Sequence, residues 1–295
     1  MNTIGGAALK VGSVKVSTIN LARIAYETNN EQEYLTQLKN TLEINLKLLD
    51  CQRNIIQRNI EKGLLHTFDC KMIEMEYLYS SIGIMGIFET MKKFGYTYED
   101  DFGNTYYKDE AFSFGKKIFK VIHNTKDLFL LDKTYHINIE AIPGESMAVR
   151  FQQADEILYP DRVVKDLPLY GNQWIPLGIK TTIKERVRIA AAFSEYCSGG
   201  DILHINVDAP FDNFDKAWNM LNYVAQSGVK YFAFTGKINA CKTNHAFYGD
   251  ICPICGEPVA TTYSRIVGFF VPIKTYSKPR LEEWKLREWH NINGE

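Results

Sequence analysis

The sequence predicts an α/β fold with parallel strands, on three observations. Between residues 1 and 235, stretches with apolar residues at helical spacing alternate with short apolar runs, an order typical of an α/β sheet or barrel. The chain has 295 residues, 45% hydrophobic and 13% aromatic, which indicates a folded protein of one large domain or two ordinary ones. Residues 236–295 are punctuated by Gly, Cys and Pro, so regular structure is expected to fade there.

The first element expected is a strand over 13–21, where the residues alternate and several are β-branched. A long helix is expected over 29–63, because leucines and isoleucines recur at helical spacing and Gly63 closes the segment. The same spacing predicts four more helices, over 75–95, 109–124, 184–200 and 213–228. Short apolar runs predict three more strands, over 135–143, 201–207 and 229–235. An amphipathic helix that packs on the body is expected over 277–289.

The net charge of the chain argues against nucleic acid as its main partner. The formal net charge is -1, whereas a protein that coats nucleic acid is normally clearly basic. The N-terminal stretch lacks the pattern of a secretory signal, and no segment approaches the length of a membrane span. We therefore expect a cytoplasmic protein that binds neither DNA nor membranes directly. In that setting the scattered cysteines are expected as buried thiols: Cys51, Cys70 and Cys197.

The other three cysteines form a cluster that predicts a metal site. Cys252 and Cys255, in C-P-I-C-G, place two thiolates on one tight turn, and Cys241 and His245 form a second pair upstream. Such a set of four ligands suits tetrahedral zinc. Two alternatives remain open: Cys252 and Cys255 as packing cysteines or a redox pair, and a fourth ligand that is Asn244 or water instead of His245.

Gly268 lies in T-T-Y-S-R-I-V-G-F-F (261–270), a run that predicts one strand. A glycine weakens a strand, and it ordinarily marks a bulge or a close backbone approach. The heptapeptide S-R-I-V-G-F-F resembles the R-[VI]-x-G-[YF] signature of glycyl radical enzymes, in which the glycine stores an unpaired electron. The resemblance implies that Gly268 carries a radical. Apolar neighbours are expected to shield it from solvent: Ile266, Val267, Phe269 and Phe270.

The zinc knuckle ahead of this signature is similar to the anaerobic (class III) ribonucleoside-triphosphate reductase family. Five segments resemble family blocks in the same order: GSVKVSTINLARIA (12–25), PGESMAVRF (143–151), YGNQWIPL (170–177), GGDILHINVDAPF (199–211) and GVKYFAF (228–234). The resemblance implies three parts: the second half of a ten-stranded α/β barrel over 1–235, a zinc-binding knuckle over 236–258, and a glycyl radical loop with a tail over 259–295. The family position of a second upstream cysteine falls on Asn244.

The resemblance also implies an activity, that of an oxidoreductase that makes deoxyribonucleotides for DNA replication from ribonucleoside triphosphates. In the family, the glycyl radical generates a thiyl radical that takes the ribose 3′ hydrogen. Water then leaves from C2′, and reduction follows at the expense of formate or a thiol system. A separate iron–sulfur activase that uses S-adenosylmethionine makes the glycyl radical.

The matched segments imply further site residues, each with a simpler structural explanation. Asn20 is implied as a catalytic residue that contacts the ribose, or else it bonds its own turn. Glu145 is implied as catalytic and Ser146 as substrate-binding, at a helix start whose amides could hold a phosphate, although a serine there is usually a cap. Asn172 is a weaker candidate for substrate binding. His204, inside an apolar strand, is expected to be a core residue.

One family feature is absent from the sequence. The thiyl cysteine of the family lies upstream of the segment that here begins at Gly12, and residues 1–11 contain no cysteine. We therefore expect an oligomer with an obligate partner chain that carries the N-terminal half and the thiyl cysteine. Three alternatives remain: a non-enzymatic zinc-ribbon binding protein, an inactive fragment of the reductase, and a spare part that replaces a damaged radical domain.

Overall fold

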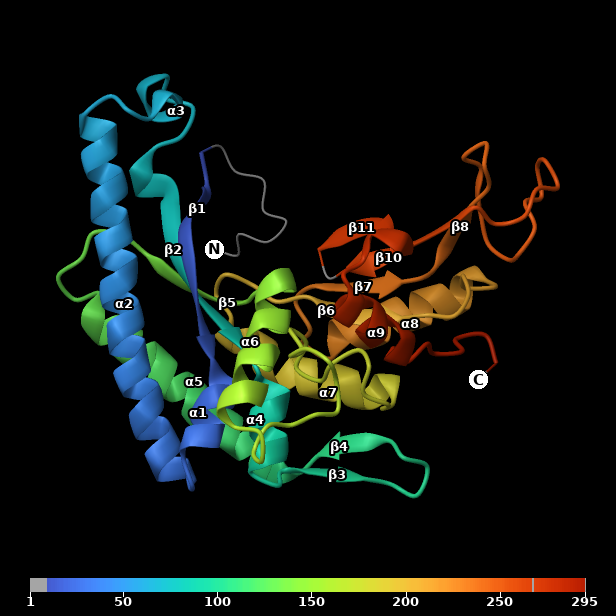
Figure 1. Cartoon of the computed structure of the whole chain (residues 1–295), viewed down its shortest axis with the longest axis horizontal. Helices are drawn as coiled ribbons and strands as arrows, with labels where there is room; N and C mark the ends of the chain where they lie inside the picture. Colours follow the sequence, from blue (N-terminus) through green and yellow to red (C-terminus); the bar gives the residue numbers. More distant parts are fainter. Residues whose placement is uncertain (1–9, 267, 295) are drawn as a thin grey trace. The chain divides into compact units, whose positions relative to one another are not determined.

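The computed structural model describes residues 10–266 and 268–294, which divide into two compact units (Figure 1). The first unit contains the residues up to Thr97, together with Tyr107–Ile142 and Phe193–Asp201. The second contains Tyr98–Tyr106, Pro143–Ala192 and the residues from Ile202 onward. The three-part division expected from the sequence, at residues 235 and 258, stays a prediction.

The first unit is built on a parallel sheet with the strand order β1-β2-β5. Its strands are β1 (Gly12–Asn20), β2 (Leu78–Met85) and β5 (Ile137–Ala141). The helix expected over 75–95 is wrong, because this region forms the short helix η1 (Met75–Tyr77), then β2, then α4 (Ile87–Lys93). The central strand of a parallel sheet is buried on both faces, so its sequence shows no alternation. Gly86, with φ at 88°, makes the turn from strand to helix.

Long helices cover this sheet (Figure 1). The predictions over 29–63 and 109–124 are confirmed as α2 (Glu31–Glu61) and α5 (Asp109–Phe129), which pack on each other, and α2 also packs on β1. Two shorter helices are α1 (Leu21–Glu27) and α3 (His66–Asp69). Of the thiols expected to be buried, only Cys197 is; Cys51 and Cys70 are exposed, because they lie on outward faces of their segments.

The second unit contains a parallel pair of strands joined by a helix. The pair is β6 (Leu203–Asn206) and β7 (Phe232–Thr235), with α8 (Phe214–Gln226) between them in the chain. The strands expected over 201–207 and 229–235 are confirmed. The helix expected over 184–200 is shorter, as α7 (Ile183–Phe193) and the turn η2 (Ser194–Tyr196), and α6 (Glu145–Leu158) precedes it. A hairpin of β3 (Thr97–Glu99) and β4 (Thr105–Tyr107) was not expected.

A four-stranded antiparallel sheet follows, with the order β11-β10-β8-β9. Its strands are β8 (Ile238–Ala240), β9 (Ala246–Phe247), β10 (Thr261–Ile266) and β11 (Phe269–Pro272). The single strand expected over 261–270 is therefore wrong. Ile266 pairs with Phe269, and Gly268 lies in the turn between the two strands; Val267 lies outside the described residues. Glycine is common in tight turns between paired strands, which accounts for the interruption of the apolar run at Gly268.

The chain ends with η3 (Ile273–Thr275) and α9 (Lys278–Leu286). The tail helix is confirmed, but its expected amphipathic character is not, since the buried residues of α9 are the charged Arg280 and Glu283. Among the described residues, no helix is both long and apolar enough to cross a membrane. The α/β class is confirmed by the parallel sheets. Closure of a ten-stranded barrel stays a prediction.

Candidate functional site

The four predicted metal ligands lie on two adjacent turns of the second unit. Cys241 follows β8 and His245 precedes β9, and the turn between them is closed by a bond from the Asn244 N–H to the Cys241 carbonyl (3.0 Å). Asn244 has φ at 64°, a conformation that asparagine tolerates. Cys252 and Cys255 share the second turn, where the Gly256 N–H bonds the Cys252 carbonyl at 2.9 Å.

The side-chain atoms of this cluster lie at separations that fit a tetrahedral metal site. One potential ligand atom from each of the four residues lies within 4.8 Å of the others. The Cys241 and Cys255 sulfurs are 3.7 Å apart, and Cys252 Sγ is 3.6 Å from His245 Nδ1. A tetrahedron with Zn–S bonds of about 2.3 Å has edges of about 3.8 Å. Three thiols and an imidazole at these separations fit zinc, with Nδ1 as the histidine ligand.

Thr243, which the sequence analysis did not single out, adds a hydroxyl to the cluster. Its Oγ1 lies 3.0 Å from Cys241 Sγ, 3.3 Å from His245 Nδ1 and 3.7 Å from Cys255 Sγ. Burial raises the pKa of Cys241, but hydrogen bonds from the Thr243 hydroxyl and from the backbone of His245 and Thr243 outweigh burial and lower that pKa to about 6. The lowered pKa favours the thiolate form of Cys241, which is the form that binds metals.

Gly268 lies at the turn of the β10–β11 hairpin and is exposed. Among the described residues other than its chain neighbours, no atom lies within 4 Å of the position that a Cβ on this glycine would occupy. The expected apolar shield is not present in the described residues, because Phe269 is 65% exposed and Phe270 is 45% exposed. Both aromatic side chains sit on the short β11 strand next to the turn, and the Phe270 ring stacks on Tyr263 of β10 with ring centres 5.8 Å apart.

The antiparallel sheet separates the metal cluster from Gly268. Ala240, next to Cys241, pairs with Thr261 at the start of β10, and Gly268 lies seven residues further along the chain. At about 3.3 Å per residue, the two sites are about 20 Å apart along the strand. A metal in the cluster can therefore hold the base of this sheet together, but it cannot touch Gly268.

The start of α6 presents the candidates Glu145 and Ser146. Gly144, with φ at 54°, precedes the helix, and no side chain caps it. Ser146 is exposed in the first turn, so the alternative of a serine cap is wrong. Glu145 Oε1 is buried and, among the described residues, has no hydrogen-bond partner. A buried carboxylate oxygen in this state is costly unless a ligand or a proton satisfies it.

The segment 170–177 contains Asn172, which is half-buried, and the buried Gln173. Gln173 Nε2 donates to the Ile202 carbonyl at 2.9 Å, and its Oε1 accepts from the His204 N–H at 3.0 Å. Gln173 thus fastens this segment to β6, beside Asn172. His204 is 1% exposed with Nδ1 3.4 Å from Thr235 Oγ1, in agreement with the expected core role.

Asn20 belongs to the first unit, at the end of β1. Its Oδ1 accepts a hydrogen bond from the Arg23 N–H at 3.0 Å and so caps α1. The simpler explanation, an asparagine that bonds its own turn, therefore holds for this oxygen. A contact of Asn20 with a ribose stays a prediction, as do the substrate-binding roles of Ser146 and Asn172.

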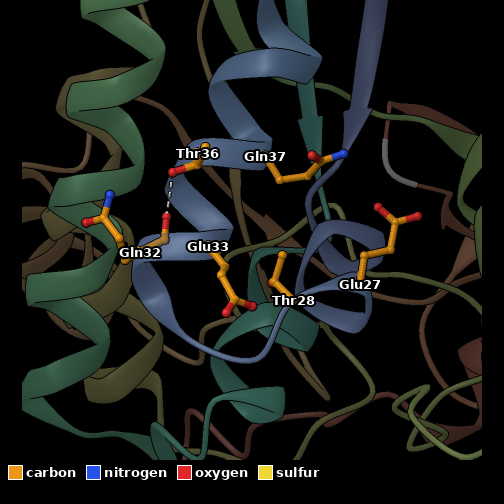
Figure 2. A pocket seen from close by; sticks show the side chains of 6 residues that line it. All are labelled: Glu27, Thr28, Gln32, Glu33, Thr36 and Gln37. Carbon is orange, nitrogen blue, oxygen red and sulfur yellow. Dashed lines mark hydrogen bonds between the residues drawn. The ribbon is translucent and has the colours of Figure 1, made fainter.

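A pocket of the first unit, about 510 Å³ in volume, lies where α1 gives way to α2. Figure 2 shows that its lining is polar throughout, and a hydrogen bond from Thr36 to the Gln32 carbonyl crosses one side of it (2.8 Å). Six residues line it: Glu27, Thr28, Gln32, Glu33, Thr36 and Gln37. None of them belongs to the candidate sites, and two exposed carboxylates disfavour an anionic ligand there.

Sequence similarity supports one family. A family model described as anaerobic ribonucleoside-triphosphate reductase matches residues 2–290. No curated protein matches the chain.

Three solved structures are similar over nearly the whole chain. One, described as an anaerobic ribonucleotide reductase, has 35% identity and a TM-score of 0.93, covering 99% of this chain and 47% of that one. The Thermotoga maritima anaerobic ribonucleotide reductase with glycerol in the active site has 36% identity and a TM-score of 0.89, covering 96% of this chain and 46% of that one. The same enzyme in complex with dATP and CTP has 35% identity and a TM-score of 0.87, covering 96% and 46%. This chain spans about half the length of these proteins.

Proposed function

Because the chain belongs to the anaerobic ribonucleoside-triphosphate reductase family, we propose that it is the part of a reductase that carries the glycyl radical, on Gly268. One observation supports this most directly. Gly268 lies at the turn of a hairpin whose first strand, β10, pairs with β8 next to Cys241 of the metal-sized cluster, and the Cβ position of this glycine is open among the described residues beyond its chain neighbours. Hydrogen-atom transfer at Cα needs such access, and a radical delocalised over the adjacent amides needs a residue without a Cβ.

We propose that zinc in the cluster has a structural role. The separations of Cys241, His245, Cys252 and Cys255 match a tetrahedral site with all four positions taken by protein, which is typical of structural zinc. The distance of about 20 Å along β10 supports a role in holding the sheet, not in the reaction. The metal would fix the strands from which the glycine hairpin projects.

A thiyl cysteine completes the proposed chemistry, and we propose that the N-terminal half of the reductase supplies it as a separate chain. The exposed Phe269 and Phe270 support a partner that covers the hairpin, because a glycyl radical must be kept from solvent and oxygen. An iron–sulfur activase that uses S-adenosylmethionine would generate the radical on Gly268. The complete complex would be an oligomer in the cytoplasm.

The proposed reaction converts a ribonucleoside triphosphate, formate and a proton into a deoxyribonucleoside triphosphate, carbon dioxide and water; a thiol system is the alternative reductant. Glu145 is proposed to move a proton, since its buried Oε1 has no hydrogen-bond partner within the described part of the chain. Asn20, Ser146 and Asn172 are proposed to bind the nucleotide. A non-enzymatic zinc-ribbon protein is not favoured, because the family match extends over residues 2–290 and not only over the knuckle.

The test uses the sensitivity of glycyl radicals to oxygen. The chain is expressed without oxygen together with the N-terminal half and the activase, air is admitted, and the products are weighed. We expect a new fragment that ends at Gly268 and is absent when the activase is omitted. Gly268→Ala should remove the fragment. The matched control is Gly236→Ala, since the nearest atom to a Cβ there is 3.9 Å away; this variant should still be cut. An intact parent chain with zinc and partner bound would refute the assignment.

A further inference from the structure

Three buried charged residues lie on the tail of the second unit: Arg280, Glu283 and Arg287. They contact both β10, which leads to Gly268, and the start of α6 at Glu145. Glu283 accepts hydrogen bonds from Arg287 Nε (2.9 Å) and Nη2 (3.0 Å), and its Oε2 also lies 3.3 Å from Arg280 Nη1. The three side chains are only 5%, 1% and 6% exposed, respectively. Two guanidinium groups therefore share one carboxylate in a buried place. Burial of such a group carries a large desolvation cost, so a contribution to the stability of the fold does not by itself explain why these charges are buried.

The remaining donors of this group hold backbone carbonyls of the site. Arg287 Nη1 donates to the Arg265 carbonyl at 2.7 Å, and Arg280 Nη2 donates to the Glu145 carbonyl at 3.3 Å. Arg265 is on β10, three residues before Gly268, and it pairs with Phe270 across the hairpin. Arg287 is thus hydrogen-bonded to β10 close to the turn that contains Gly268.

The tail that carries Arg287 is itself anchored on both sides. Before and after it in the chain, Trp284 and Trp289 flank the Lys237 ammonium, whose Nζ lies 5.4 and 4.2 Å from the two ring centres. The Glu288 N–H bonds the Leu177 carbonyl at 2.9 Å. The His290 N–H bonds the Asn206 carbonyl of β6 at 3.0 Å. The chain segment around Arg287 is therefore held in place on both sides, and this fixes the position of the Arg287 guanidinium next to β10.

We infer that Arg287, oriented by Glu283, is a positioning residue that fixes the place of the Gly268 hairpin for hydrogen-atom transfer. The inference rests on the proposed radical at Gly268. Arg287 is placed to act on the glycine indirectly, through its hydrogen bond to the Arg265 carbonyl of β10. A planar fork with five donors can bond Glu283 with two of them and the carbonyl with a third. Lysine keeps the charge but cannot hold this geometry.

The first measurement is turnover per glycyl radical in the complex of the chain with the N-terminal half and the activase. The radical is counted by electron paramagnetic resonance. We expect Arg287→Lys to lower turnover per radical by about 10- to 100-fold, since misplacement of reacting groups by about 1 Å costs about 100-fold. The KM for the nucleotide and the zinc content should not change. Lys285→Gln, exposed on the same helix, is the matched control and should equal the parent.

Full turnover per radical in Arg287→Lys would overturn the inference. If that variant loses zinc or melts early, the isosteric Glu283→Gln decides in its place: turnover per radical below the parent at normal zinc content supports the inference, and unchanged turnover overturns it.

A second measurement needs no radical, so it separates this inference from the proposed function. Amide hydrogen exchange is compared between the zinc-loaded parent and Arg287→Lys. Loss of a charge-assisted hydrogen bond should speed exchange in β10 and β11 by about 10-fold or more, with β6 and β7 unchanged. Equal exchange in the hairpin would overturn the inference even if the radical is present. A parent complex without a radical, but with slow exchange that Arg287→Lys speeds, would overturn only the proposed function.

Discussion

Removal of one zinc ligand gives the sharpest test of the metal cluster. His245→Ala leaves three thiolates, Cys241, Cys252 and Cys255, around the site. Structural zinc in small protein sites binds with about 10–16 kcal/mol. If the four ligands contribute comparably, the loss of His245 costs about 2.5–4 kcal/mol, or about 100- to 1,000-fold in zinc affinity. The separation of 3.6 Å between Cys252 Sγ and His245 Nδ1 is the basis for counting the imidazole as a full ligand.

The assay is competition between the zinc-loaded chain and a coloured chelator, under reducing conditions without oxygen. His245→Cys should restore most of the affinity, because it returns four ligands to the site. Asn244→Gly is the matched control, since glycine accepts the φ of 64° and removes the alternative ligand without strain. It should bind zinc as the parent does. Parent-like affinity in His245→Ala, or a large loss in Asn244→Gly, would show that the wrong residue has been chosen.

Two further predictions concern buried charge in the second unit. Arg186→Met removes the guanidinium that donates to the buried Ile175, Pro176 and Ile179 carbonyls, although the Pro176 carbonyl keeps the Ile179 N–H at 3.1 Å. This variant should lower the free energy of unfolding in urea by about 3–5 kcal/mol. The exposed Arg188→Met should lower it by less than about 1 kcal/mol, and equal losses would contradict this. Burial and the Arg186 charge lower the pKa of His290 from 6.5 to about 4, so the unfolded chain binds this proton first as the pH falls. Stability should decline by up to about 3 kcal/mol between about pH 6.5 and 4, and a His290→Gln variant with an equally steep decline would disprove the assignment.

The sequence predicted those elements whose pattern is local and one-sided. The buried face of α2 repeats every three to four residues through Leu38, Leu42, Leu46 and Leu49, which is why the helix over 29–63 was found. The strand β2 was missed because both of its faces are buried, so Leu78–Met85 has no period of two and could be read as helix. The turn at Gly268 was missed for a related reason, as apolar residues continue on both sides of it.

The candidate site was predictable only where its members are close in the sequence. The spacing of Cys241, Cys252 and Cys255 predicted a cluster with His245 as one candidate for the fourth ligand, and the structure brings these four side chains together, because a knuckle places residues a few positions apart at one point. The bond from Arg287 to the Arg265 carbonyl spans 22 residues, and the bond from Arg280 to the Glu145 carbonyl spans 135. No local pattern encodes such contacts. The sequence therefore predicted that the helix packs on the body, but not that its buried residues are the charged Arg280 and Glu283.

The docked tail has a consequence for a chain damaged by oxygen. A cut at Gly268 would free residues 269–295 covalently, but this piece contains β11, which pairs with β10, and Arg280 and Arg287, which hold carbonyls outside the piece. The nicked protein would stay assembled and keep its native size, and only denaturation would reveal the break. Preparations exposed to air would thus look intact although they carry no repairable radical. Replacement of the broken piece would first require β11 to separate from β10 and the buried contacts of Arg280 and Arg287 to break.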